Sequence, residues 1–178
     1  MTLAAFLALA SVQMMAAISP GPAVLMTART GITRGMRAGV FLAAGIGAGA
    51  VFWAASALFG LAVLFKVAPA VLSVLKIVGG AYLVWIAIQM WRHASEPLDD
   101  SAGGPAAQGG LSAFWLGIRT QLANPKPVVF FGAVFAGMVP PDTATWIKIA
   151  LLGVVFSTDF LWNVVVARIF SLAGPRAT

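Results

Sequence analysis

The tetrapeptide Ser19-Pro20-Gly21-Pro22 lies near the end of the first apolar run of this sequence, and Asn124-Pro125-Lys126-Pro127 lies inside the fourth. A proline inside a helix removes the hydrogen bond to the carbonyl four residues before it, and two prolines two residues apart remove two such bonds. Both tetrapeptides therefore predict an interruption in a segment that would otherwise form a continuous helix.

The composition around these interruptions indicates an integral membrane protein. Of 178 residues, 61% are hydrophobic and 9% are charged, with a mean hydropathy of +0.97, whereas a soluble domain is roughly 25% charged. The apolar residues form long blocks without strand-like alternation, which favours α-helices over a β-barrel. Five blocks come near or exceed the roughly 20 residues that cross a bilayer: 3–27, 38–65, 68–91, 111–138 and 146–170. We expect one all-α transmembrane domain over residues 1–178.

Charge and cysteine content exclude several other classes of protein. The net charge is +6, but the eleven Lys and Arg residues are scattered at the ends of apolar blocks, so we expect no nucleic-acid partner. With no cysteine and a single histidine, the sequence offers no disulfide framework, zinc site or thiol nucleophile. We therefore predict no enzyme, no cofactor and no metal. The first block has no preceding Lys or Arg, so we expect a spanning segment there, not a cleaved signal peptide.

The distribution of Lys and Arg predicts the orientation. Basic residues that follow the first, third and fifth blocks would lie on one side of the membrane, and on the positive-inside rule that side is cytoplasmic. The N-terminus is then outside, and the segment 93–110, rich in Gly and Pro, is a cytoplasmic linker between a first repeat over about 1–92 and a second over about 111–178. The basic residues concerned are Arg29, Arg34, Arg37, Arg92, Arg168 and Arg176.

The interruptions are candidate binding sites, because irregular backbone at membrane depth is tolerated only where protein or a water-filled cavity satisfies it. Residues that precede the prolines are expected to be extended, and Pro22 and Pro127 suit the first position of a new helix. The free N–H groups of that helix suit an anion, and carbonyls freed before the break suit an ammonium. The alternative is that each pair of prolines marks a loop between helices. The residues expected to be extended are Ser19, Gly21, Asn124 and Lys126.

A weak internal repeat relates the two interruptions. PGPAVL, from Pro20 to Leu25, aligns with PKPVVF, from Pro125 to Phe130, at a shift of 105 residues. Corresponding broken helices in two halves of a chain point to the binding site of a transporter. With three spans in each half, the second repeat would be inverted and a sixth helix would follow the fifth block. The sequence stops at SLAGPRAT, so we expect the sixth helix to be missing.

Few polar side chains lie inside the predicted spans. Asp159 is the only carboxylate well inside one, and Asn163 lies four residues on, on the same helix face. Asp159 is a candidate to hold a substrate ammonium or to exchange a proton, and Lys126 is a candidate for the substrate carboxylate; the alternative is an ion pair between the two that neutralises both. Gln13 is expected to form a hydrogen bond between helices. The candidate substrate-binding and coupling residues are Ser19, Pro20, Gly21, Pro22, Asn124, Pro125, Lys126, Asp159 and Asn163.

Glycines in the second block have a packing interpretation. Gly35 and Gly39, and likewise Gly45 and Gly49, are spaced as in small-xxx-small motifs, which allow close contact between helices. We therefore expect these glycines to pack against neighbouring helices.

Taken together, these stretches resemble the lysine exporter (LysE/RhtB-type) family of amino-acid efflux translocators. The resemblance is carried by SPGPAVLMTARTGITRGMRAGVFLAAGIGAGA (19–50), FWLGIRTQLANPKPVVFF (114–131) and TDFLWN (158–163). It implies a six-helix fold and export of amino acids or analogues from a bacterial inner membrane, driven by the proton motive force. A homodimer that completes the fold is one way to supply the missing helix. The alternative functions are a passive channel and an inactive, truncated pseudo-transporter or scaffold.

Overall fold

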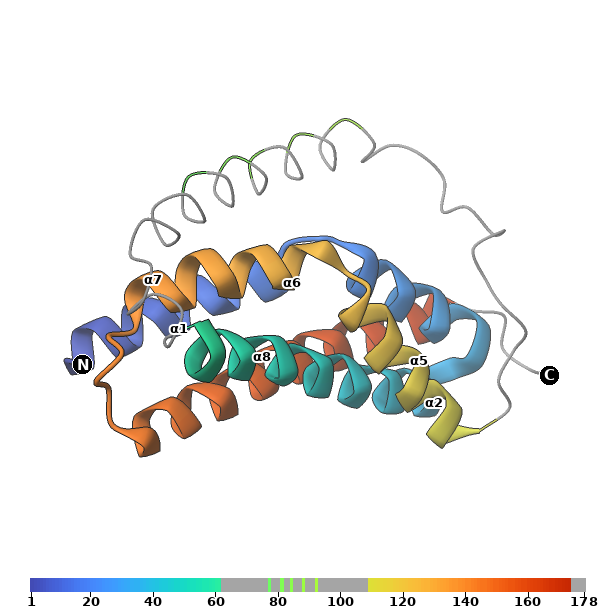
Figure 1. Cartoon of the computed structure of the whole chain (residues 1–178). Helices are drawn as coiled ribbons and strands as arrows, with labels where there is room; N and C mark the ends of the chain where they lie inside the picture. Colours follow the sequence, from blue (N-terminus) through green and yellow to red (C-terminus); the bar gives the residue numbers. More distant parts are fainter. Residues whose placement is uncertain are drawn as a thin grey trace.

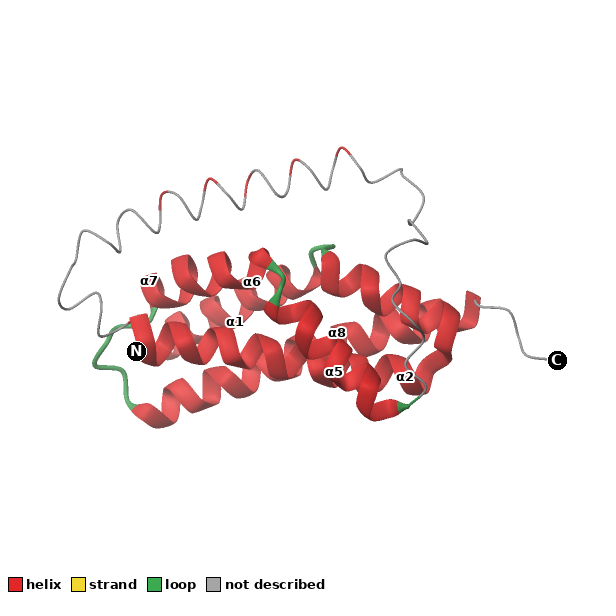
Figure 2. Ribbon diagram, turned by 45° about the vertical axis from the view of Figure 1, so that its right-hand side comes forward, coloured by secondary structure: helices red, strands yellow, loops and turns green. Residues whose placement is uncertain are grey.

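The computed structural model describes residues 1–61, the separate positions 77, 81, 84, 88 and 92, and residues 109–173. The predicted span 68–91 and the linker 93–110 lie almost wholly outside the described residues. In the described part of the chain every regular element is helical (Figure 2), which confirms the predicted all-α class. The elements are α1 (Leu3–Ile18), α2 (Pro22–Ala55), η1 (Ser56–Leu61), α5 (Gly110–Leu122), α6 (Pro125–Phe130), η3 (Phe131–Phe135), α7 (Ala136–Met138) and α8 (Thr145–Ala173).

The first tetrapeptide breaks a helix, as predicted. Helix α1 ends at Ile18, Ser19 leaves the helical region (φ −57°, ψ 125°), Gly21 is extended, and α2 begins with Pro22 at its first turn. The missing N–H of Pro22 costs nothing there, because the first N–H groups of a helix have no intrahelical partner. Figure 1 shows α1 and the first part of α2 following one another along the molecule, with the break near the middle.

The turn between the first two blocks lies within the predicted connection, but the connection is much shorter than predicted. We expected a connection over 28–37, whereas α2 is helical on both sides of Gly35, which alone has non-helical angles (φ 75°, ψ 179°). This φ lies in the left-handed region that glycine adopts without a Cβ clash. Figure 1 shows that the ribbon of α2 turns back at the end of the molecule away from the N-terminus.

The second tetrapeptide also breaks a helix, but two details differ from the prediction. Helix α5 ends at Leu122 and Asn124 is extended. The new helix begins at Pro125, not Pro127, and Lys126 is helical, not extended. Both prolines fit within the first turn because its N–H groups lack helical partners, and the Asn124 side chain caps the turn by accepting from the Lys126 N–H at 3.1 Å. Figure 1 shows α5, α6 and α7 running opposite to α1 and the start of α2.

Close packing joins α2 to α8 and to α5. A Cβ on Gly45 would collide with the carbonyl oxygen of Phe114, and a Cβ on Gly117 with that of Leu42. A Cβ on Gly39 would likewise be too close to the Ala167 side chain, and a Cβ on Gly49 too close to the Gln121 side chain. The predicted packing role is therefore confirmed for these positions. Gly35 is the exception, because a Cβ at this position would meet nothing within 4 Å, and its role is the turn.

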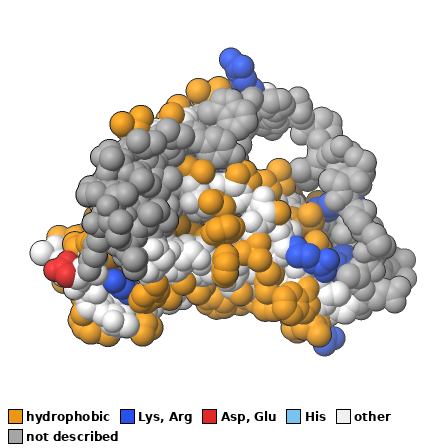
Figure 3. Space-filling view, in the orientation of Figure 1, with side chains coloured by type: hydrophobic (Ala, Val, Ile, Leu, Met, Phe, Trp, Pro, Cys, Tyr) orange, Lys and Arg blue, Asp and Glu red, His pale blue; other side chains and the backbone are white. Residues whose placement is uncertain are grey.

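Large apolar side chains cover the outside of the bundle. Leu3, Met15 and Trp146 are each more than two thirds exposed, and Figure 3 shows hydrophobic side chains over much of the visible face. So much exposed apolar surface suits contact with lipid. Among the described residues, Pro22–Gly60 and Thr145–Leu172 are long and apolar enough to cross a membrane, and Leu3–Ile18 and Pro125–Phe135 are shorter apolar helices, each forming part of an interrupted segment.

Candidate functional site

Both helix breaks open onto one pocket. Its walls come from α1, the first turn of α2, the two breaks, α5, α6, the start of η3, and α8. The cavity volume is about 40 Å³, which is room for about three water molecules. An amino acid therefore requires the pocket to widen. The lining residues are Gln13, Ala16, Ala17, Ser19, Gly21, Ala23, Val24, Gln121, Asn124, Lys126, Pro127, Phe130, Phe131, Asp159 and Asn163.

Lys126 connects the second break to the first. Its ammonium Nζ donates to the carbonyl oxygens of Ala16 at 2.7 Å and Ser19 at 2.8 Å. We expected Pro20 to free the Ala16 carbonyl for an ammonium, and in this structure that ammonium belongs to the protein itself. Gly21 lies beside the same side chain, so a Cβ there would be 3.8 Å from Lys126 Cδ.

Asp159 accepts hydrogen bonds from two glutamines. Gln13 Nε2 donates to Oδ2 at 2.8 Å, and Gln121 Nε2 approaches Oδ1 at 3.5 Å. Gln13 Nε2 also lies 3.2 Å from the Thr158 hydroxyl, so it links α1 to α8 as expected of a hydrogen bond between helices. The carboxylate is thereby held from α1 and α5, and its residue is only 8% exposed.

The alternative of a direct Lys126–Asp159 ion pair does not match the described contacts. Lys126 gives its N–H groups to two carbonyls, and Asp159 accepts from two amides. In the described contacts no hydrogen bond joins these two side chains. The pocket thus keeps a cation and an anion that are separately held.

Asn163 forms a second polar contact one turn further along α8. Its Nδ2 donates to the Asp159 backbone carbonyl at 2.8 Å, and its Oδ1 accepts from the Thr27 hydroxyl at 2.7 Å. Asn163 is 2% exposed and Thr27 is fully buried. This contact ties the first turns of α2 to α8 directly beside the pocket.

Most of the residues proposed from the sequence lie at the pocket. Ser19, Gly21, Asn124, Lys126, Asp159 and Asn163 line it. Pro20, Pro22 and Pro125 are not in its lining and act on the course of the backbone. Sequence reasoning missed Gln121 and Thr27, and it gave Gln13 only a structural role. A polar residue inside an apolar block, such as Gln121 four residues before Pro125, is the signal that could have found them.

Comparison of the sequence with known proteins places the chain in a family of membrane translocators. The family model described as LysE type translocator matches residues 14–178, and the chain belongs to this family. It is a membrane transport protein and not an enzyme.

Individual relatives point to amino-acid efflux. The chain is 31% identical to the threonine efflux protein of Escherichia coli K12 over 173 residues, which is 96% of this chain and 84% of that protein. It is 32% identical to the homoserine/homoserine lactone efflux protein of Salmonella typhimurium over 77% of this chain and 66% of that protein. An uncharacterized membrane protein of E. coli K12, YahN, is 32% identical over 89% of this chain and 71% of its own length. No solved structure matches the chain significantly.

Proposed function

We propose that this chain exports amino acids or related small zwitterionic solutes across the bacterial inner membrane, driven by the proton motive force. The observation that supports this most directly is the pocket at the two helix breaks, which holds Lys126 and Asp159 without a hydrogen bond between them. A zwitterion carries an anion and a cation on one small molecule, so it is complementary to two such groups.

The carboxylate of the substrate would bind near Lys126 and the start of α2. Ala23 and Val24, in the first turn of α2, line the pocket, and N–H groups at that position have no intrahelical partner. A carboxylate there would compete with the Ala16 and Ser19 carbonyls for the Lys126 ammonium. Binding would then loosen the contact that holds the two breaks together, and the pocket would widen.

Asp159 would couple export to protons. As a carboxylate it attracts an ammonium, and once protonated it does not. A proton that enters from outside would therefore favour release of the amino acid. The opposite directions of the two broken helices (Figure 1) support the inverted repeat that alternating access uses.

Threonine and homoserine are the first substrates to test, because relatives are named for them. In inside-out vesicles that contain the chain, export becomes uptake, and labelled threonine should accumulate when a proton gradient is imposed. A protonophore should abolish accumulation. Asp159→Asn should abolish it too, because the neutral amide neither attracts the substrate ammonium nor exchanges a proton.

The other functions give different results in the same vesicles. A passive channel would let threonine equilibrate at the same rate with and without the gradient. A scaffold that does not transport would move no threonine, homoserine or other amino acid of a panel above vesicles without the chain.

A further inference from the structure

The pocket contains two buried amide oxygens that no group of the described structure satisfies. Gln13 Oε1 and Gln121 Oε1 have no hydrogen-bond partner, although the two side chains are only 2% and 3% exposed. Buried polar atoms are nearly always paired, and an unpaired acceptor is unfavourable. Since both residues line the pocket, a donor that enters the pocket is the expected partner.

The two oxygens flank one carboxylate. Each glutamine gives its amide nitrogen to a different oxygen of Asp159. In a primary amide the oxygen and nitrogen share one carbon, so each free oxygen lies next to the carboxylate that its own nitrogen contacts. Three residues that carry acceptors therefore line the pocket from three elements, with Gln13 on α1, Gln121 on α5 and Asp159 on α8.

We propose that Gln13, Gln121 and Asp159 form the subsite for a primary ammonium group of the substrate; this rests on the proposed function. An ammonium has three N–H donors and no acceptor, which matches two amide oxygens and one carboxylate oxygen. The protein's own ammonium at Lys126 is engaged by Ala16 and Ser19. A substrate carboxylate offers no donor, so this subsite rejects that end of a zwitterion and fixes its direction in the pocket.

Two analogues of threonine separate the ends of the molecule. Threonine amide keeps the ammonium and lacks the carboxylate, and 2,3-dihydroxybutyrate keeps the carboxylate and lacks the ammonium. Each is added as an inhibitor of labelled threonine uptake into inside-out vesicles with wild-type chain, Gln13→Met or Gln121→Met. Methionine has a similar length and no amide.

The variants should lose recognition of the ammonium alone. The concentration of threonine amide that gives half-inhibition should rise about 10-fold or more, as loss of a hydrogen bond to a charged group implies, and that of 2,3-dihydroxybutyrate should not change. Gln13→Asn, which keeps an amide, should restore part of the loss. Thr143→Val is the matched control, because Thr143 Oγ1 is also buried without a partner but Thr143 is not in the pocket lining. In this variant the half-inhibition concentration of neither analogue should change.

A second measurement covers variants that transport poorly. Purified protein in detergent is heated with each analogue, since a ligand that binds the folded state raises the unfolding temperature. Stabilisation by threonine amide should be lost in both glutamine variants, and stabilisation by 2,3-dihydroxybutyrate should remain.

Three results would overturn the inference. If inhibition by both analogues weakens equally in the glutamine variants, the glutamines only hold the pocket together. If inhibition by neither analogue changes, water satisfies the amide oxygens. In both cases wild-type uptake of threonine would leave the proposed function standing. If the wild-type chain neither moves nor is stabilised by threonine or other amino acids, the proposed function fails and the subsite with it.

Discussion

Lys126 belongs to the second helix break, but its ammonium satisfies the backbone of the first. It donates to two carbonyls more than a hundred residues earlier in the chain, at 2.7 and 2.8 Å. Such charge-assisted hydrogen bonds are stronger than those between neutral groups. One side chain therefore fixes the distance between the two interruptions.

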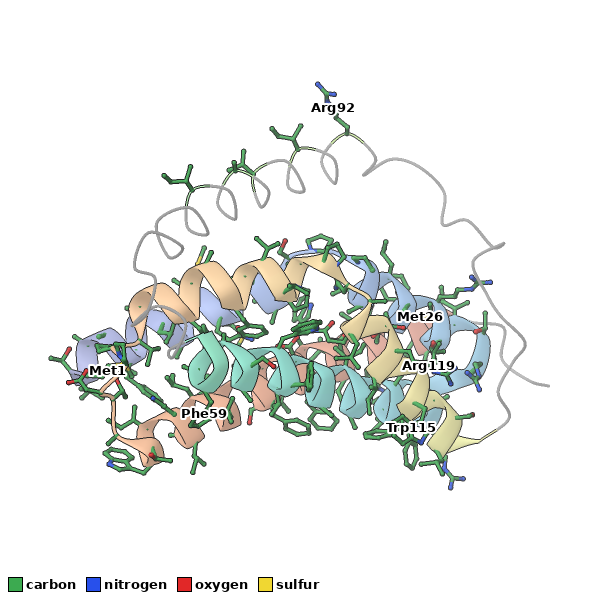
Figure 4. The ribbon with its side chains drawn as sticks, in the orientation of Figure 1. Met1, Met26, Phe59, Arg92, Trp115 and Arg119 are labelled. Atoms are coloured by element: carbon green, nitrogen blue, oxygen red, sulfur yellow. The ribbon has the colours of Figure 1, made fainter. Side chains whose placement is uncertain are left out.

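Replacing Lys126 should weaken both the fold and transport. In Lys126→Met the carbonyls of Ala16 and Ser19 lose their donor, so we expect a loss of about 1–3 kcal/mol of stability and loss of threonine uptake. Thermal unfolding in detergent and vesicle uptake measure the two effects. Arg119→Met is the control, because Arg119 is exposed and, among the described residues, its side chain donates to the Trp115 carbonyl of its own helix; Figure 4 labels Arg119 and Trp115. Equal melting of the two variants would show that Lys126 does not hold the breaks together.

Asn124 should matter as a helix cap. Its side chain accepts from the Lys126 N–H, and replacing such a cap with alanine costs about 1 kcal/mol. Asn124→Ala should therefore melt earlier than wild type, and Asn124→Asp, which keeps the accepting oxygen, should melt close to it. If Asn124→Asp is as unstable as Asn124→Ala, the loss of stability comes from the amide nitrogen of Asn124 and not from its oxygen.

At this scale the sequence predicts polar residues inside the spans better than it predicts their partners. Asp159, Asn163 and Lys126 were found because polar groups inside apolar blocks require a reason. Gln121 and Thr27 were missed, since their contacts are with residues 38 and 136 positions away. Nothing in a local window shows which helix faces meet.

Among the elements, α2 sets the spacing of the bundle. Its glycines let the backbones of α5 and α8 approach without an intervening side chain. The spacing of these glycines predicted close packing, but it did not show which glycine is a turn. Likewise, two prolines two residues apart allow either to begin the helix, and the cap at Asn124 decides for Pro125.

Adding one methyl group at these contacts should be destabilising. Gly45→Ala and Gly117→Ala place a Cβ against a backbone carbonyl of the facing helix, and overpacking of this kind costs about 1–3 kcal/mol. Gly153→Ala on α8 has nothing within 4 Å of the new Cβ and should instead gain about 0.5–1 kcal/mol of helix stability. Melting temperatures that shift in the same direction for all three variants would contradict a packing role.

For the molecule as a whole, the basic residues define an end. Arg34 and Arg37 flank the turn at Gly35, and Figure 3 shows a group of Lys and Arg side chains at the end away from the N-terminus. At the other end Lys148 lies over the Phe59 ring and donates to the Pro141 carbonyl.

The helical class and the site of each break could be predicted from the sequence, because both follow from proline chemistry and block length. The predicted third span remains a prediction, since it lies outside the described residues.

The orientation can be tested because the chain has no cysteine. On the positive-inside rule, a maleimide that does not cross membranes should label Thr2→Cys and Asp142→Cys in intact cells. Gly109→Cys, which is exposed at the other end, should react only after the membrane is opened. The reverse pattern would place the N-terminus in the cytoplasm.

A cavity of about 40 Å³ has a consequence for the amino-acid concentration at which the proposed export would begin. When the form that accepts cargo is the rarer one, the apparent affinity falls in proportion to its population. An exporter of the proposed kind would therefore stay shut at ordinary amino-acid levels and open only when an amino acid accumulates.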